Sequence, residues 1–325
     1  MKIFPWIQLF FRWLNQQRGK VFFALFSTLF FLVVLFPFED LSDLASSQIA
    51  ALTHNQVFVQ FRKMGFGIFP PSIHISENIR VETAQMPALS ADQVELRPGV
   101  IALLQKKIAG SLGIKGFLKG DIEISIRPNG KSESGIEKHM IELTAKKLSL
   151  ADLKNLANLP VAMKGELELD GKSNTDLSFN ESPDMDIHMK IEKFEMPPAN
   201  IPTGMGPMSV PDLKFSHVEL KGRLSNGKLN IESGQLGKAQ DELVGTLKGS
   251  MDLQFRGKGN PVPLPGGYDF QLQLKVKPQF QQKSAALLSL LDGFKSPNED
   301  GSAQYNFKVS APNTYENPQF LPLKQ

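Results

Sequence analysis

The sequence of 325 residues contains no cysteine, which excludes disulfide scaffolds, zinc ribbons and thiol enzymes. An excess of one charge is also missing, because 36 lysines and arginines stand against 33 aspartates and glutamates, a net charge of +3. A nucleic-acid-binding protein concentrates basic residues on one surface, so this balance argues against nucleic acid as a partner. The five histidines are scattered, and no HExxH pair, G-x-S-x-G elbow or phosphate-binding loop occurs. The sequence therefore predicts a protein that is not an enzyme and has no catalytic residue, cofactor or metal.

The few charges at the N-terminus are unevenly distributed and indicate a membrane segment. Residues 1–20 carry four basic and no acidic side chains, whereas acidic residues follow an uncharged run of eighteen residues over 21–38. A helix of this length reaches the lower limit of what spans a hydrocarbon core of about 30 Å. The positive-inside rule places the N-terminus in the cytoplasm. The predicted anchor consists of Val21, Phe22, Phe23, Leu25, Phe26, Leu29, Phe30, Phe31, Leu32, Val33, Val34, Leu35 and Phe36.

A cleaved signal peptide is the alternative interpretation of this segment. Signal peptides usually have an apolar region of roughly 7 to 15 residues, followed directly by a small-x-small cleavage site. Here the run is longer, and the nearest weak candidate site is Asp43-Leu44-Ala45. Retention of the helix divides the chain into a cytoplasmic tail (1–20), a transmembrane helix (21–38) and a β-rich domain on the other side of the membrane (39–325).

From Val57 onward, apolar and polar residues alternate with period 2, which is typical of strands with one solvated face. Asn226-Gly227 lies between two such runs and predicts a two-residue hairpin turn. A sheet with one solvent-exposed face indicates antiparallel pairing. The predicted fold is mainly β: an N-terminal transmembrane helix followed by a long, curved, largely antiparallel sheet with a few short helices. Strands are expected at 73–82, 121–127, 166–170, 185–194, 218–224, 229–231, 243–255, 270–276 and 303–309.

Short helices and loops interrupt the alternating runs. Helices are expected over 100–108, over 150–159 with Ser149 as N-cap, and over 280–291, where the apolar residues suit a plug at the end of a sheet. The segments 197–211 and 257–267 are rich in proline and glycine, so they are expected to be loops or crossings at a sheet edge.

A Lys-Gly pair recurs inside four of the alternating runs, with its glycine at Gly120, Gly165, Gly222 and Gly249. The intervals between these glycines are too irregular for a solenoid of fixed period. A glycine inside a strand marks a bulge or a bend. We therefore expect these four positions to set the curvature of the sheet.

One strand offers a candidate metal site. Asp184, Asp186 and His188 are alternate residues, so they share one face of the strand. The residues between them are apolar, however, and the solvated side of an ordinary strand accounts for the three polar side chains. We interpret this trio as the solvated side of an ordinary strand.

Three consecutive segments together form a pattern in which a short helix leads through a proline into a G-x-L-x-L strand. They are Leu148-Ser149-Leu150-Ala151-Asp152-Leu153, then Leu159-Pro160-Val161, then Lys164-Gly165-Glu166-Leu167-Glu168-Leu169. With the N-terminal anchor and the β-rich remainder, they make the chain resemble the type II secretion system protein N (GspN) family. The pattern is also similar to that of AsmA-type envelope proteins. The resemblance covers most of residues 39–325 and carries no catalytic residue.

The resemblance to the GspN family implies an accessory of a type II secretion system in the bacterial inner membrane, with residues 39–325 in the periplasm. Its partners would be membrane lipid at the N-terminal helix and other secretion-system proteins, bound through strand edges. The AsmA-like alternative makes the sheet curl into a trough that shelters acyl chains of phospholipid or lipopolysaccharide. The candidate apolar groove then consists of Leu220, Leu224, Leu229 and Ile231.

Overall fold

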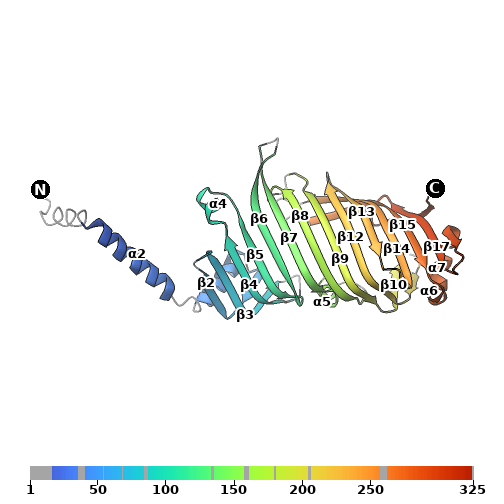
Figure 1. Cartoon of the computed structure of the whole chain (residues 1–325), viewed down its shortest axis with the longest axis horizontal. Coiled ribbons are helices and arrows are strands. Elements are labelled where there is room, and N and C mark those ends of the chain that lie inside the picture. Colours follow the sequence, from blue (N-terminus) through green and yellow to red (C-terminus); the bar gives the residue numbers. More distant parts are fainter. Residues whose placement is uncertain are drawn as a thin grey trace, which may run out of the picture.

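The structure is a computed structural model that describes residues 17–35, 41–53, 55–67, 69–83, 87–132, 135–156, 161–178, 181–203, 206–256 and 262–323. A sixteen-stranded sheet dominates these residues (Figure 1). Every pairing in it is antiparallel. The prediction of a mainly β protein with a large antiparallel sheet and a few short helices is confirmed.

The strands follow one another across the sheet nearly in chain order: β1-β3-β4-β5-β6-β7-β8-β9-β12-β13-β14-β15-β17-β16, with β2 on β3 and β18 on β17. Their bounds are β1 Val57–Gln60, β2 Lys63–Gly67, β3 Ser72–Thr83, β4 Leu89–Pro98, β5 Gly110–Phe117, β6 Gly120–Lys131, β7 Glu137–Ser149, β8 Lys164–Thr175, β9 Asp184–Met196, β12 Leu213–Ser225, β13 Lys228–Leu236, β14 Leu243–Arg256, β15 Val262–Val276, β16 Lys295–Pro297, β17 Ala303–Ala311 and β18 Gln319–Pro322. The helices are α2 Arg18–Leu35, α3 Ser42–Leu52, α4 Val100–Leu104, α5 Leu150–Leu156, α6 Pro278–Lys283, α7 Ala285–Ser289 and the 3-10 turn Asp292–Phe294.

Two local predictions are confirmed by backbone geometry. Asn226 and Gly227 both have positive φ, 51° and 72°, and they join β12 to β13 as the tight hairpin turn that this pair favours. At the start of α5, the backbone N–H of Asp152 donates to the hydroxyl of Ser149 at 3.3 Å, so Ser149 caps the helix.

Two glycines of the Lys-Gly pairs, Gly165 and Gly222, lie at register shifts of the sheet. The pairing of β8 with β9 shifts register between Lys164 and Glu166, and Gly165 between them has φ of 135°. The pairing of β12 with β13 shifts at Gly222, where a Cβ would lie only 3.0 Å from the backbone oxygen of Asn230. Such bulges increase the local twist of a sheet, as the sequence pattern predicts.

Two loop predictions are wrong in part. Within 197–211, residues Ala199–Thr203 and Gly206–Val210 form β10 and β11, a separate two-stranded sheet. Within 257–267, the residues from Val262 onward belong to β15. β15 pairs with β14 there, but its pairing with β17 begins only at Tyr268. The prolines of β15 therefore lie on a free edge, where a residue without a backbone N–H breaks no hydrogen bond between strands.

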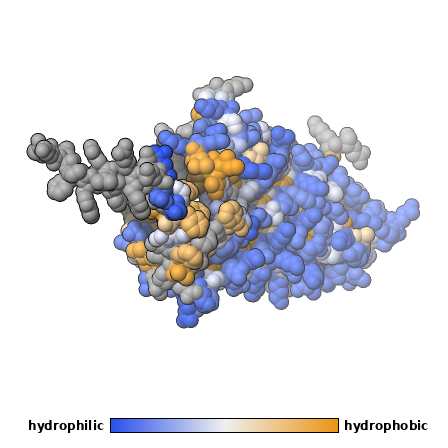
Figure 2. Space-filling model, turned by 60° about the vertical axis from the view of Figure 1, so that its left-hand side comes forward, coloured by the Kyte–Doolittle hydropathy of each residue, from blue (hydrophilic) through white to orange (hydrophobic). Residues whose placement is uncertain are grey.

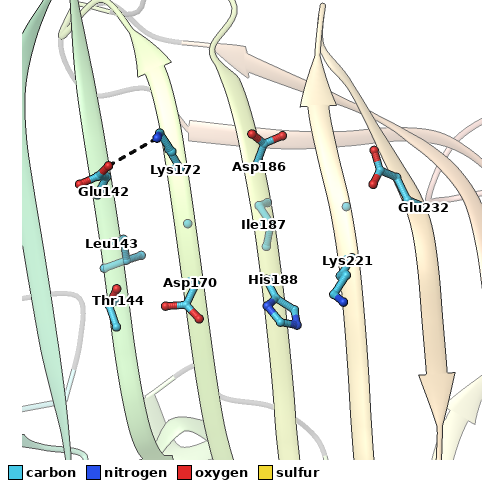
Figure 3. Close-up of a pocket in the computed structure, with 12 residues that line it drawn as sticks. Glu142, Leu143, Thr144, Asp170, Lys172, Asp186, Ile187, His188, Lys221 and Glu232 are labelled. Carbon is cyan, nitrogen blue, oxygen red and sulfur yellow. Dashed lines mark ion pairs between the residues drawn. The ribbon is translucent and has the colours of Figure 1, made fainter.

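The far end of the β14–β15 hairpin bends away from the plane of its neighbours. Gly266 lies at the bend, opposite Asp252, where the register of the pair shifts. Figures 1 and 3 show this end of the hairpin passing behind β8, β9 and β12. The sheet therefore curls toward the face that is turned away from the viewer in Figure 1.

The described part of the chain has no helix that combines the length and the apolar character needed to cross a membrane. α2 overlaps the predicted span over 21–38 as far as Leu35, and residues 36–38 lie outside the described residues. The structure thus does not support the predicted transmembrane helix.

Candidate functional site

The four residues of the predicted apolar groove share one face of the sheet. Leu224 of β12 lies directly opposite Leu229 of β13, and Ile231 lies opposite Gly222, two residues before Leu224. Leu220 is a further two residues along the same face of β12. Leu224 is completely buried, whereas Leu220, Leu229 and Ile231 are half-buried. The register of β12 and β13 thus brings the four side chains to one face of the sheet.

This apolar face extends across nearly the whole sheet. Ile231 has a directly paired residue on each neighbouring strand, and each of those has a partner on the next strand. All the residues in this cross-strand row are apolar or glycine. In order from β2 to β18, this row is Phe66, Ile73, Leu96, Leu112, Ile124, Leu143, Gly171, Ile187, Gly222, Ile231, Gly249, Phe270, Val309 and Phe320. We call it the trough row.

Glycine alternates with large side chains in the middle of the trough row. Gly171, Gly222 and Gly249 stand between Leu143, Ile187, Ile231 and Phe270 on successive strands. A Cβ added at Gly171 would meet only Leu143, at ordinary contact distances of 3.7 Å and beyond. The large residues of this stretch remain half-buried. The apolar face therefore has open space above Gly171, whereas a Cβ at Gly222 would lie 3.0 Å from the backbone oxygen of Asn230 and one at Gly249 would clash with the backbone of Asp269.

Packed layers cover the apolar face at its lower edge and at its C-terminal end. Along the lower edge in Figure 1, Leu150 of α5 packs with Ala145, Leu148 and Leu167 in a buried cluster. At the C-terminal end, α6 and α7 contribute Phe280 and Leu288 to a second cluster with Val276, Ala303, Tyr305 and Phe307. The predicted helical plug over 280–291 is thus present as two short helices. Together with the β14–β15 hairpin, these elements border the apolar face of the sheet.

The opposite face of the same strands is polar. The row next to the trough row reads Ser111, Ser125, Glu142, Lys172, Asp186, Arg223, Asn230, Ser250, Asp269 and Ser310. Glu142 accepts from Arg127 at 2.6 Å and lies 3.6 Å from Lys172, so charges are paired across the strands. Between two such polar rows lies a shallow hollow that includes Glu142, Asp170, Lys172, His188 and Lys221 (Figure 3).

A ladder of histidines and glutamates stands on this polar face across β9 and β12. His188 Nε2 lies 2.7 Å from Glu219 Oε1, and His217 Nδ1 lies 2.6 Å from Glu192 Oε1. Lys221 Nζ is 3.2 Å from the same Glu219 oxygen. Hydrogen bonding to His188, and then to Lys221 and His217, lowers the pKa of Glu219 to about 2, against the opposing effect of partial burial.

The residues of the candidate metal site also lie on the polar face. His188 is held by Glu219, and Asp186 lies 3.8 Å from Arg223. Among the described residues, no group of histidine, aspartate and glutamate side chains has an arrangement that could hold a metal ion. Asp186 and His188 therefore lie on the solvated side of the sheet, in contact with charged side chains of β12.

Sequence reasoning missed two features of this site. Gly222 and Gly249 of the trough row were expected to bend the sheet, whereas the open space above Gly171 depends on the cross-strand register of β7, β8 and β9. The ladder around Glu219 likewise depends on the pairing of β9 with β12, which places residues 31 positions apart in contact. No family model, curated protein or solved structure matches the chain.

Proposed function

We propose that this protein binds the acyl chains of a membrane lipid, phospholipid or lipopolysaccharide, in the apolar trough, as a non-enzymatic envelope protein of the AsmA-like kind. The observation that carries this proposal is the trough row, an unbroken apolar line across the sheet that stays half-buried in its middle. A polar outer face and a continuous apolar inner face suit a protein that holds hydrocarbon inside and meets water outside. Exposing a CH₂ group to water costs about 0.8 kcal/mol, so an apolar floor lowers the cost of holding an acyl chain outside the bilayer.

Membrane attachment at the N-terminus belongs to the same proposal. Phe22, Phe23, Leu25 and Leu35 of α2 are between 66 and 75% exposed, which is unfavourable for apolar side chains in water. We place residues 1–20 in the cytoplasm, the anchor over 21–38 in the bacterial inner membrane and residues 39–325 in the periplasm. An alkaline phosphatase fusion after Leu52 is therefore expected to be active in a bacterial host, and an inactive fusion would contradict this orientation.

A second candidate function is the one that the GspN resemblance implies, an accessory of a type II secretion system. The polar face favours this second function, since its paired charges and shallow hollow are features that a protein partner can bind. In that case the trough is a structural feature, and the partners are secretion-system proteins.

The trough is tested by filling it. The substitution Gly171→Phe places a ring over the open floor, and it is tolerated by the backbone because Gly171 has neither a positive φ nor a close neighbour. We expect the lipid that co-purifies with the full chain, measured by mass spectrometry of the extract, to fall several-fold. Ile187→Trp on the next strand narrows the same space and serves as a second blocking variant.

The matched control is Lys172→Phe, which adds a ring of the same size one residue away on the polar face. It is expected to leave the bound lipid unchanged. Equal lipid in the blocked and control variants, with both folded by circular dichroism, would rule out the trough as the binding site.

A further inference from the structure

The exposed hydrophobic side chains of this protein are concentrated at one end of the sheet. Outside α2, the described residues expose eleven large hydrophobic side chains between residues 41 and 108, none between 109 and 263, and five between 264 and 321. Figure 2 shows hydrophobic surface gathered at the N-terminal end, while the visible flank of the sheet is hydrophilic. The eleven are Leu44, Leu52, Phe58, Phe66, Phe69, Leu96, Val100, Ile101, Leu103, Leu104 and Ile108.

The most exposed group lies in the loop between β4 and β5, residues 99–109, which we call the α4 loop. Ile101 is 74% exposed and Leu104 is 81% exposed, and α4 buries none of its residues. Val100, Leu103 and Ile108 are also exposed. A loop that projects its apolar side chains in this way contributes nothing to the core.

The α4 loop is nevertheless built as a defined structure. Its neck is closed by a hydrogen bond from the N–H of Gly99 to the carbonyl of Ala109, at 2.9 Å. A Cβ at Gly99 would lie 2.8 Å from the Cβ of Ala109, so the two chain segments approach too closely for a larger residue. Within the loop, the N–H of Lys107 donates to the carbonyl of Ala102 at 2.8 Å. The apolar side chains are therefore presented on a fixed turn.

The charges of the α4 loop are of one sign. Lys106 and Lys107 follow the apolar turn directly and are both exposed, and residues 99–109 contain no acidic side chain. Exposed aliphatic residues next to lysines are the combination with which peripheral segments enter the interface of an anionic bilayer. A protein partner of matching surface would need an apolar pocket and acidic groups, whereas a membrane supplies both features without further specificity.

We propose that the α4 loop is a second membrane contact, which inserts Ile101 and Leu104 into the interface of an anionic bilayer while Lys106 and Lys107 meet the lipid headgroups. Leu96 of the trough row precedes the loop by a few residues and is itself exposed. The contact therefore brings the N-terminal end of the trough against the bilayer surface. This inference concerns the position of the molecule and does not depend on lipid in the trough.

The absence of cysteine allows the contact to be tested by single-site labelling of the full chain. An environment-sensitive fluorophore is attached to Ile101→Cys or Leu104→Cys, and the protein is reconstituted in vesicles of phosphatidylcholine and phosphatidylglycerol that contain a nitroxide-labelled lipid. We expect strong quenching at both sites. The matched control is Leu290→Cys, an exposed leucine after α7 at the other end of the sheet, 63% accessible, whose label should remain unquenched.

A label at Leu25→Cys in α2 separates this inference from the proposed anchor. Quenching of the α4 labels supports the second contact, whatever the result at Leu25. Labels at Ile101 and Leu104 that are quenched no more than the label at Leu290 overturn it, even when the Leu25 label is quenched. Shielding of the α4 labels from aqueous iodide without quenching by the lipid also overturns it, because a protein then covers the loop.

A separate variant tests the role of Lys106 and Lys107. In the chain labelled at Leu104→Cys, the double substitution Lys106→Glu and Lys107→Glu is expected to reduce lipid quenching clearly, because like charges then face the anionic headgroups. Lys228→Glu, an exposed lysine at the β12–β13 turn, is the control and should have no effect. Equal quenching in the doubly substituted and control chains would contradict the headgroup contact.

Discussion

At the scale of single residues, the polar face is organised by cross-strand ion pairs, and Glu219 has the most partners among those on β9 and β12. Its carboxylate contacts His188, Lys221 and His217 within 2.7 to 3.5 Å. These contacts favour the charged form and explain why the pKa of Glu219 falls from 4.5 to about 2. The ladder therefore fixes the register between β9 and β12, directly behind the predicted groove.

The lowered pKa of Glu219 gives a pH-dependent prediction. A carboxyl group with a depressed pKa stabilises the folded state above its ordinary pKa of 4.5, and this stabilisation is lost as the pH falls toward 2. Glu219→Gln is thus expected to be less stable than the native chain in urea at pH 6, with a difference that shrinks at pH 3. Glu232→Gln, which changes an exposed side chain on the neighbouring strand β13, is the control. An effect of Glu219→Gln that is equally large at pH 3 would contradict the ion-pair account.

At the scale of elements, α6 and α7 close the C-terminal end of the trough. Leu288 is 7% exposed in the terminal cluster, whereas Leu290, two residues later, is 63% exposed. Leu288→Ala is expected to cost about 3 kcal/mol because it leaves a cavity, and Leu290→Ala less than about 0.5 kcal/mol. Urea unfolding of both variants measures the difference. Similar losses for the two would mean that the plug is not packed as described.

Elements with a strong local signal were predictable from the sequence, and those that depend on distant contacts were not. The Asn226-Gly227 turn and the cap at Ser149 depend on residues within one turn of the chain, and both are present. The strand through Pro263 and Pro265 was missed, because a proline is tolerated only where the neighbouring strand ends, and that is a property of the pairing. The same holds for the open floor at Gly171, which appears only when the register of β7, β8 and β9 is known.

At the scale of the whole molecule, the sheet has two distinct ends and two distinct faces. The N-terminal end exposes apolar side chains, and the C-terminal end is plugged by α6 and α7. An acyl chain in a bilayer is already out of water. A trough can therefore accept the chain if its floor is about as apolar as the bilayer interior, and tight binding is not required. Contact of the open end with a membrane and an apolar floor leading away from it are the two features that such an exchange needs.

The most direct test of this account is site-specific photo-crosslinking in cells. A probe at Leu220 or Ile231 points into the trough, and a probe at the adjacent Lys221 or Asn230 points outward from the polar face. We predict phospholipid or lipopolysaccharide adducts at Leu220 and Ile231 only. Protein adducts from Lys221 and Asn230, with no lipid at the two inward positions, would contradict the lipid-binding trough and favour the secretion accessory.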